Sequence, residues 1–301
     1  MPFLNILLDI IAPIFVLISL GYLFQKKWHF DMQALTRVLL YLVMPATLVV
    51  SLTQSELSAD FVWDTSVFCL LMLVALYVLS LAGSLIMRYR KDMKQAFSLS
   101  VMYYNSGNYG FPASELAFPT LGLAVQSIVL AVQNFLVFTL GLFFVSVGRI
   151  SARKAFLQSF KMPFVYALIL AFAIRNFGLQ LPGFVWLPIE YLAEALVPMA
   201  LVTLGMQLAR TRITDAWQAS LASLVCRLVI SPLIGYGLVL LLDIDPRIAP
   251  ILVVSTSYPT AINTVLIAME FGSREDFAAN AVFLSTVCSI VTVAVVIFLV
   301  R

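Results

Sequence analysis

Two short polar stretches interrupt an otherwise apolar chain, and they hold the side chains best suited to bind a ligand. YYNSGNYGFP at 103–112 combines amides and hydroxyls with two glycines and a proline, and STSYPTAIN at 255–263 repeats the combination without glycine. Proline removes a backbone N–H and clashes with the preceding helical turn, and glycine loosens the backbone. We therefore predict two broken helices, with the breaks at Gly107, Gly110, Pro112 and Pro259.

The polar side chains at and near these breaks could hold a small anion. The second half of each broken helix is expected to start near Ala113 and near Thr260, and a helix N-terminus offers free N–H donors and a partial positive charge. Asn and Ser beside a break can instead simply cap the helix, but an unbroken helix around Gln133 needs no cap. The predicted substrate-binding residues are Asn105, Asn108, Gln133, Asn134, Tyr258, Thr260 and Asn263.

Three charged residues fall within apolar segments: Glu115, Glu194 and Arg227. A charge in mid-membrane costs about 2.5–3.5 kcal/mol on the mildest scale, so such residues usually have a partner. We hypothesise that Arg227 pairs with Glu115 or Glu194. The pair would be either a structural ion pair or part of proton coupling or anion attraction.

The composition identifies an integral membrane protein. Of 301 residues, 62% are hydrophobic and 11% are charged, whereas a soluble domain has about 25% charged residues. The three cysteines are not spaced as metal ligands and there is one histidine, so we expect no metal and no cofactor. No Ser–His, paired-Asp or HExxH arrangement indicates an enzyme.

Segments of about 20 apolar residues predict membrane spans. Ten are expected, at roughly 3–24, 34–55, 62–87, 94–119, 123–147, 162–177, 188–209, 217–242, 247–270 and 277–300. With both termini outside, most lysines and arginines of the loops fall on the cytoplasmic side, as the positive-inside rule requires. The net charge of +3 is thus a signal of topology and does not suggest nucleic-acid binding.

A basic linker at 148–162 divides the spans into two sets of five, at 1–147 and 163–301. LVMPATLVVSL at 42–52 is similar to ALVPMALVTLG at 195–205, and the two polar stretches occupy equivalent places in the halves. An odd number of spans in each half gives the halves opposite orientations in the membrane. Such inverted repeats are typical of secondary transporters, in which paired interrupted helices mark the binding site near the midplane.

NSGNYGFP, the QN pair at 133–134 and SYPTAINTVLIAMEFGSREDFAANAVFLST resemble the auxin efflux carrier family, which includes bacterial permeases and plant carriers. The resemblance implies an all-α fold of ten helices, related to the bile-acid sodium symporters, in which helices 4 and 9 cross. It also implies a homodimer through helices 1, 2, 6 and 7 and elevator-type movement of the other helices. The short linker and the absence of a charged residue between Asp64 and Arg88 differ from the plant carriers and favour a bacterial member.

The sequence therefore predicts a transporter of a small organic anion, such as a carboxylate, in the bacterial inner membrane, working by alternating access and in the direction of efflux. One alternative is a sodium- or proton-coupled symporter. A second is an anion channel, but a selectivity filter needs a symmetric ring of loops, which two inverted breaks in one chain do not provide.

Overall fold

The computed structural model describes residues 3–55, 58–136, 163–211, 217–270 and 272–301. This part of the chain is helical and contains no strand, only one isolated β-bridge. Six of its helices are long and apolar enough to cross a membrane, namely Phe3–Trp28, Met32–Gln54, Ala59–Ile86, Gly183–Ala209, Trp217–Leu241 and Glu275–Val300. A multi-pass membrane protein follows from these helices.

Three of the long helices contain a π-helical segment that ends two residues before a proline. Phe3–Trp28 comprises α1 (Phe3–Ile6), η1 (Leu7–Ile11) and α2 (Ala12–Trp28), with Pro13 at the start of α2. The same order occurs in α3 (Met32–Val38), η2 (Leu39–Val43) and α4 (Met44–Gln54), and in α14 (Trp217–Val225), η4 (Cys226–Ile230) and α15 (Ser231–Leu241). Proline cannot donate to the α-helical ladder, and a π-turn absorbs the missing bond without ending the helix.

The remaining described helices are shorter or uninterrupted. They are α5 (Ala59–Ile86), α6 (Lys91–Met102), α7 (Gly110–Ala117), α8 (Gly122–Leu136), α11 (Pro163–Asn176), α12 (Gly183–Glu194), α13 (Leu196–Ala209), α16 (Ala249–Ser255), α17 (Asn263–Glu270) and α18 (Glu275–Val300). The end of the helix predicted at 123–147 and the linker predicted at 148–162 lie outside the described residues.

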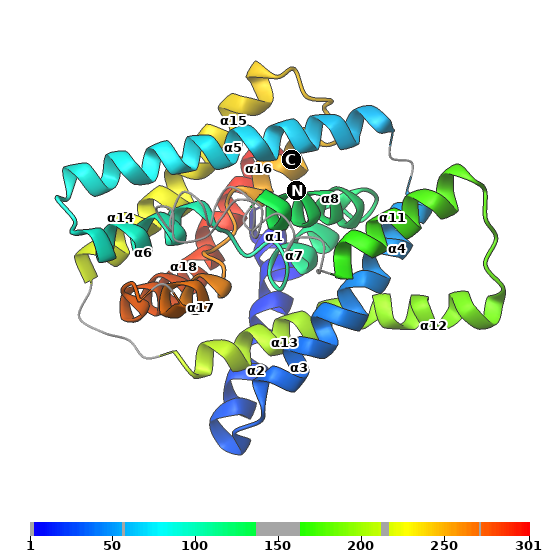
Figure 1. Cartoon of the computed structure of the whole chain (residues 1–301), viewed down its shortest axis with the longest axis horizontal. Coiled ribbons are helices and arrows are strands. Elements are labelled where there is room, and N and C mark those ends of the chain that lie inside the picture. The colour runs from blue at the N-terminus through cyan, green and yellow to red at the C-terminus, as the bar shows by residue number, and fades with distance from the viewer. Residues whose placement is uncertain (1–2, 56–57, 137–162, 212–216, 271) are drawn as a thin grey trace.

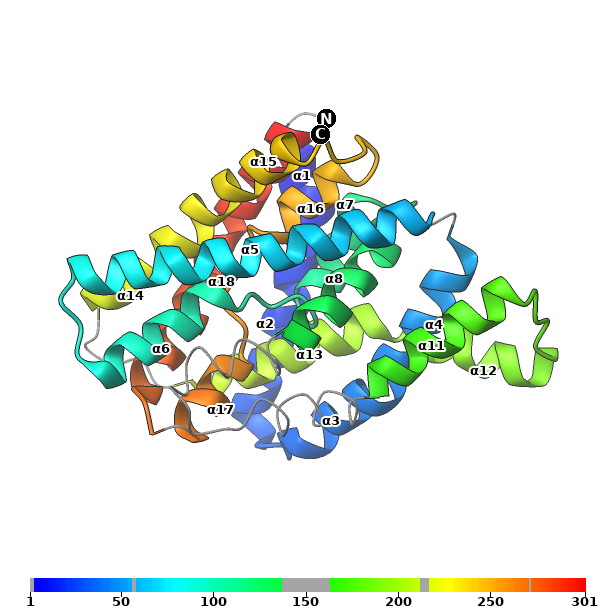
Figure 2. The same ribbon diagram turned by 45° about the horizontal axis from the view of Figure 1, so that its top comes forward.

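The helices form two packed groups (Figure 1). In one, α2 packs along α13, and α4 packs against α11 and α12; in the other, α5 runs across α6, α8 and α15, and α18 packs on α14, α16 and α17. The two chain ends lie beside each other in both ribbon views (Figures 1 and 2), and the rings of Phe3 and Phe298 are in edge contact at 5.8 Å between centroids. The start of α1 and the end of α18 therefore lie at the same end of the molecule.

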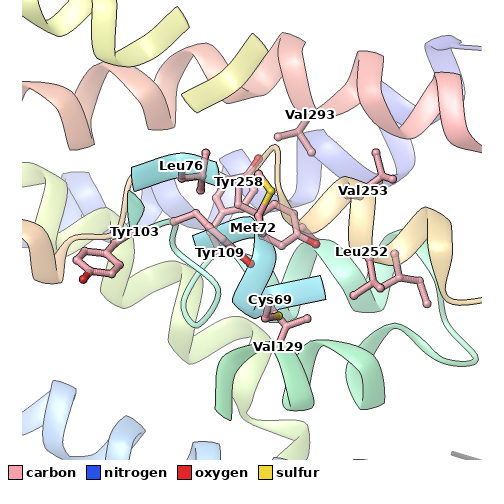
Figure 3. Packing of buried hydrophobic residues seen from close by; sticks show 14 of the residues in the cluster. Cys69, Met72, Leu76, Tyr103, Tyr109, Val129, Leu252, Val253, Tyr258 and Val293 are labelled. Atoms are coloured by element: carbon pink, nitrogen blue, oxygen red, sulfur yellow. The ribbon is translucent and has the colours of Figure 1, made fainter. Parts of the chain in front are cut away.

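The buried core lies around the two interrupted helices. Figure 3 shows Tyr109 and Tyr258, one from each interruption, packed among side chains of α5, α8, α16 and α18, including Met72, Val129 and Val293. Both tyrosines have no exposed surface, and their ring centroids are 5.6 Å apart. The two tyrosines thus hold the polar interruptions against the apolar core.

Candidate functional site

Both predicted helix breaks are present; the first begins earlier in the chain than predicted, and the second contains Pro259 as predicted. The first helix ends at Met102 and resumes as α7 at Gly110, so the break covers 103–109. Pro112 is the third residue of α7, where its missing N–H does not disturb the helix. The second break covers 256–262, between α16 and α17, and contains Pro259. Resumption at Gly110 and Asn263 corrects the starts expected near Ala113 and Thr260.

The two breaks cross in contact with each other. Tyr104 and Thr260 form an antiparallel β-bridge. The backbone N–H of Asn105 donates to Pro259 O at 2.8 Å, and that of Ala261 donates to Tyr103 O at 2.9 Å. These bonds satisfy backbone groups that have no helical partner, which is the requirement for non-helical backbone in a membrane.

A cavity of about 330 Å³ lies against this crossing. Among the described residues, no charged side chain lines it, and six side-chain amides do. The amides belong to Asn105, Asn108, Gln133, Asn134, Gln207 and Asn263. The rest of the wall consists of leucines, isoleucines and Met44, together with Thr36, Tyr103, Tyr104, Ser106, Gly107, Ala261 and Thr264. The cavity therefore combines hydrogen-bonding groups at the crossing with an apolar wall, as small-molecule sites commonly do.

Several polar atoms at this cavity have no hydrogen-bond partner among the described residues. They are Asn105 Nδ2, Gln133 Oε1 and the Tyr103 hydroxyl, in side chains that are at most 8% exposed. The other end of the Gln133 amide is fixed, because Nε2 donates to Tyr104 O at 3.0 Å. A buried polar atom without a partner costs about 1–3 kcal/mol, so these three atoms are unsatisfied groups in the wall beside the cavity.

Two of the predicted binding residues do not line this cavity. Tyr258 and Thr260 are fully buried and hold the crossing together. The Tyr258 hydroxyl lies 2.7 Å from Ser114 Oγ. Thr260 Oγ1 donates to Ser100 O at 3.0 Å. The structure brings the other five predicted residues, Asn105, Asn108, Gln133, Asn134 and Asn263, together with Gly107 at one cavity.

Gln207 is a polar lining residue that the sequence reasoning missed. It comes from α13, and its Oε1 accepts a hydrogen bond from Asn108 Nδ2 at 3.3 Å. The signal was present, since Gln207 is an isolated amide within the apolar run LVPMALVTLGMQLA at 196–209. Only the fold shows that it faces the first break.

The N-terminus of α7, which is the second half of the first broken helix, does not offer free N–H groups to an anion. The N–H groups of Gly110 and Phe111 donate to Asn105 O and Gly107 O, and Ala113 donates to Tyr109 O. The loop therefore satisfies the donors that were expected to bind an anion. The start of α17 lines the cavity through Ile262, Asn263 and Thr264, but the N–H groups of Thr264 and Val265 likewise donate to Ala261 O and Ile262 O.

The hypothesis that Arg227 pairs with Glu115 or Glu194 is wrong. In the described part of the chain, the ion pairs are Arg247–Asp245 and Arg274–Asp276. Arg227 instead donates to backbone carbonyls and to Ser231. Glu115 and Glu194 line a separate cavity of about 360 Å³ beside α4 and α12, so folding places these carboxylates away from the crossing.

Comparison with known proteins shows that the chain is similar to membrane transporters. The sequence model of the family described as "Membrane transport protein" matches residues 145–297. An uncharacterized transporter of Methanocaldococcus jannaschii is 22% identical over 95% of this chain and 96% of its own length. Another, from Methanothermobacter thermautotrophicus, is 25% identical over 94% of this chain and 95% of its own. A putative malonate transporter of Rhizobium meliloti is 32% identical over 38% of this chain and 36% of its own length.

Proposed function

From the premise that the chain belongs to the membrane transport protein family, we propose that it is a secondary transporter of a small organic anion, with a carboxylate as the group recognised. The observation that carries the proposal is the uncharged cavity lined by six amides at the crossing of two interrupted helices. A carboxylate accepts hydrogen bonds, and the side-chain amides of the lining can donate them. The family also indicates transport as the activity, not catalysis.

Among the described residues the lining holds no cation, and this suits a carrier because a carrier must release its substrate. An anion held by amides alone gains less free energy than one held by a buried arginine. The apolar wall around Leu39, Leu130 and Leu266 would contact the carbon skeleton. The name of the Rhizobium meliloti relative suggests malonate as a first substrate to test.

We further propose alternating access by an elevator movement of two inverted five-helix repeats, 1–147 and 163–301. The two packed groups of helices support the proposal. One group would form the fixed scaffold. Through the first, second, sixth and seventh predicted spans, at 3–24, 34–55, 162–177 and 188–209, it would also form a homodimer in the lipid bilayer. The other group carries both crossing segments and would move with the substrate.

We propose export from the cytoplasm across a bacterial inner membrane, with both termini on the outer side. A membrane potential, negative inside, favours the exit of an anion by about 2.3 kcal/mol per 100 mV for each charge. Efflux of a monoanion would therefore need no coupling ion. The bias of lysine and arginine toward the predicted cytoplasmic loops supports this orientation.

The test is flux of labelled malonate and of a series of monocarboxylates in proteoliposomes. We expect saturable flux with counterflow, which a channel does not show. Asn108→Ala and Asn134→Ala should lower the rate about tenfold or more, because each removes a hydrogen-bonding group from the cavity. Gln33→Ala, which removes an exposed amide on α3, is the matched control and should transport like wild type. Unchanged rates in both cavity variants would refute the proposed site.

A further inference from the structure

Arg227 is a buried cation that the proposed anion site does not use. It lies in η4, it has no exposed surface, and it does not line the amide cavity. No carboxylate among the described residues forms an ion pair with it. A guanidinium at this depth is expensive unless other groups compensate its charge.

The compensating groups are the carboxyl-terminal ends of α6 and α16, the two half-helices that precede the breaks. Arg227 Nη1 donates to Val101 O at 2.8 Å, in the last turn of α6. Nη2 donates to the carbonyl oxygen of Thr256, the residue that caps α16, and to Ser231 Oγ. Ser231 Oγ in turn donates to Thr256 O at 2.7 Å. The last carbonyls of a helix have no helical partner and carry about half a negative charge in sum.

The same guanidinium also contacts the crossing. Its Cζ atom lies 4.9 Å from the centroid of the Tyr104 ring, within the range of a cation–π interaction. Tyr104 forms the β-bridge with Thr260. One side chain therefore contacts both half-helices at the points where they enter the crossing.

We infer that Arg227 is a fixed counter-charge that neutralises the carboxyl-terminal ends of α6 and α16 together and so positions the crossing segments. The guanidinium supplies from within the chain the positive charge that these helix ends require. The crossing therefore keeps its geometry without sodium. Where the proposed transport holds, it follows that the transport needs no coupling cation at this point.

Hydrogen exchange measured by mass spectrometry tests the inference without any substrate. Peptides covering 101–109 and 256–264 report on the N–H groups of Asn105 and Ala261, which bond across the crossing. We expect Arg227→Gln to accelerate exchange in both peptides by roughly ten- to a hundredfold, because a hydrogen bond to a charged group is lost at each end. Peptides of α2 and α13 should exchange as in wild type.

Two variants frame this result. Arg210→Gln is the matched control, since Arg210 also donates to a backbone carbonyl, Phe30 O at 2.9 Å, but at an exposed position; it should leave both crossing peptides unchanged. Arg227→Lys keeps the charge but lacks the planar fork that reaches two carbonyls. The exchange rates of its crossing peptides should lie between those of wild type and Arg227→Gln. If Arg227→Gln does not yield folded protein, Arg227→Lys is compared with wild type instead.

Two further conditions test the cation itself. Guanidinium added in the low millimolar range should restore protection in Arg227→Gln and leave wild type unchanged, and replacing sodium by choline should not alter exchange in wild type. Acceleration in only one crossing peptide, equal acceleration throughout the protein, or sodium-dependent protection in wild type would each overturn the inference. Because no flux is measured, these outcomes are distinct from a failure of the transport assay.

Discussion

The crossing of 103–109 with 256–262 and the contact between α2 and α13 both bring the backbones of distant segments together, by opposite means. At the crossing, backbone groups bond directly to each other, and Arg227 compensates the helix ends. Between α2 and α13, the backbones touch because side chains are missing. A Cβ atom on Gly21 would lie 2.1 Å from Val202 O, and one on Gly205 would lie 1.9 Å from Ile18 O.

The difference shows two solutions to packing without water. Small residues let unbroken helices approach closely, and van der Waals contact then holds them. Non-helical backbone must instead find a hydrogen-bond partner for every polar group. The first kind of contact is rigid and apolar. The contact between non-helical segments leaves a few polar atoms without a hydrogen-bond partner, and these atoms belong to residues that line the cavity.

The largest effect is expected where the glycine contact is broken. Gly205→Leu places a side chain against the Ile18 carbonyl, and backbone cannot yield as a side chain does, so we expect a loss of about 3 kcal/mol or more in the free energy of unfolding. Recovery of monodisperse protein in detergent and its thermal unfolding measure this loss. Gly237→Leu is the control, because a Cβ there meets nothing within 4 Å. Equal stability of the two variants would show that the α2–α13 contact is not as close as described.

A smaller effect is expected from a methyl group at the crossing. The Cβ of Gly110→Ala would lie 2.6 Å from Gln126 Nε2, which donates to Ser106 O at 2.7 Å. Because the obstacle is a side chain, it can move at the cost of this hydrogen bond, and we expect a loss of about 1–2 kcal/mol. Thermal unfolding of Gly110→Ala and Gly205→Leu, measured in parallel, checks which variant loses more stability. A loss as large as that of Gly205→Leu would contradict the contrast between side-chain and backbone obstacles.

Removing one hydroxyl from the crossing should cost about 1 kcal/mol. Tyr258→Phe deletes the group that hydrogen-bonds Ser114 Oγ but keeps the ring that packs on Tyr109. Tyr166→Phe, at an exposed position on α11, is the control in the same unfolding measurement. If Tyr258→Phe left stability unchanged but reduced malonate flux, Tyr258 would contact the substrate after all.

The smallest change in stability is expected at the cavity itself. Asn105→Ala removes an Nδ2 atom that has no partner, so the free energy of unfolding should change by less than about 0.5 kcal/mol or increase slightly. If the proposed function is right, the affinity for the transported anion should nevertheless fall about tenfold or more. Thermal unfolding with and without malonate and the other test carboxylates separates the two effects. A marked loss of stability without ligand would show that Asn105 is structural.

Much of this protein follows from its sequence because the membrane imposes severe rules on composition. An apolar chain with so few charges has to be a membrane protein, and proline, glycine and amides clustered within an apolar segment have to mark a broken helix. Five of the seven predicted binding residues line one cavity for this reason. That Asn108 or Asn134 binds a substrate remains a prediction.

Only the tertiary structure decided which polar groups were already satisfied. Tyr258 and Thr260 have the same chemistry as the lining residues, yet their partners, Ser114 and Ser100, lie far away in the sequence. Gln207 enters the cavity because α13 packs beside the first break. For Arg227, the sequence predicted a carboxylate partner, because side-chain charges are visible in it. The actual partners are the carbonyl ends of two helices, and such backbone charges exist only once the helices have formed and stopped at particular residues.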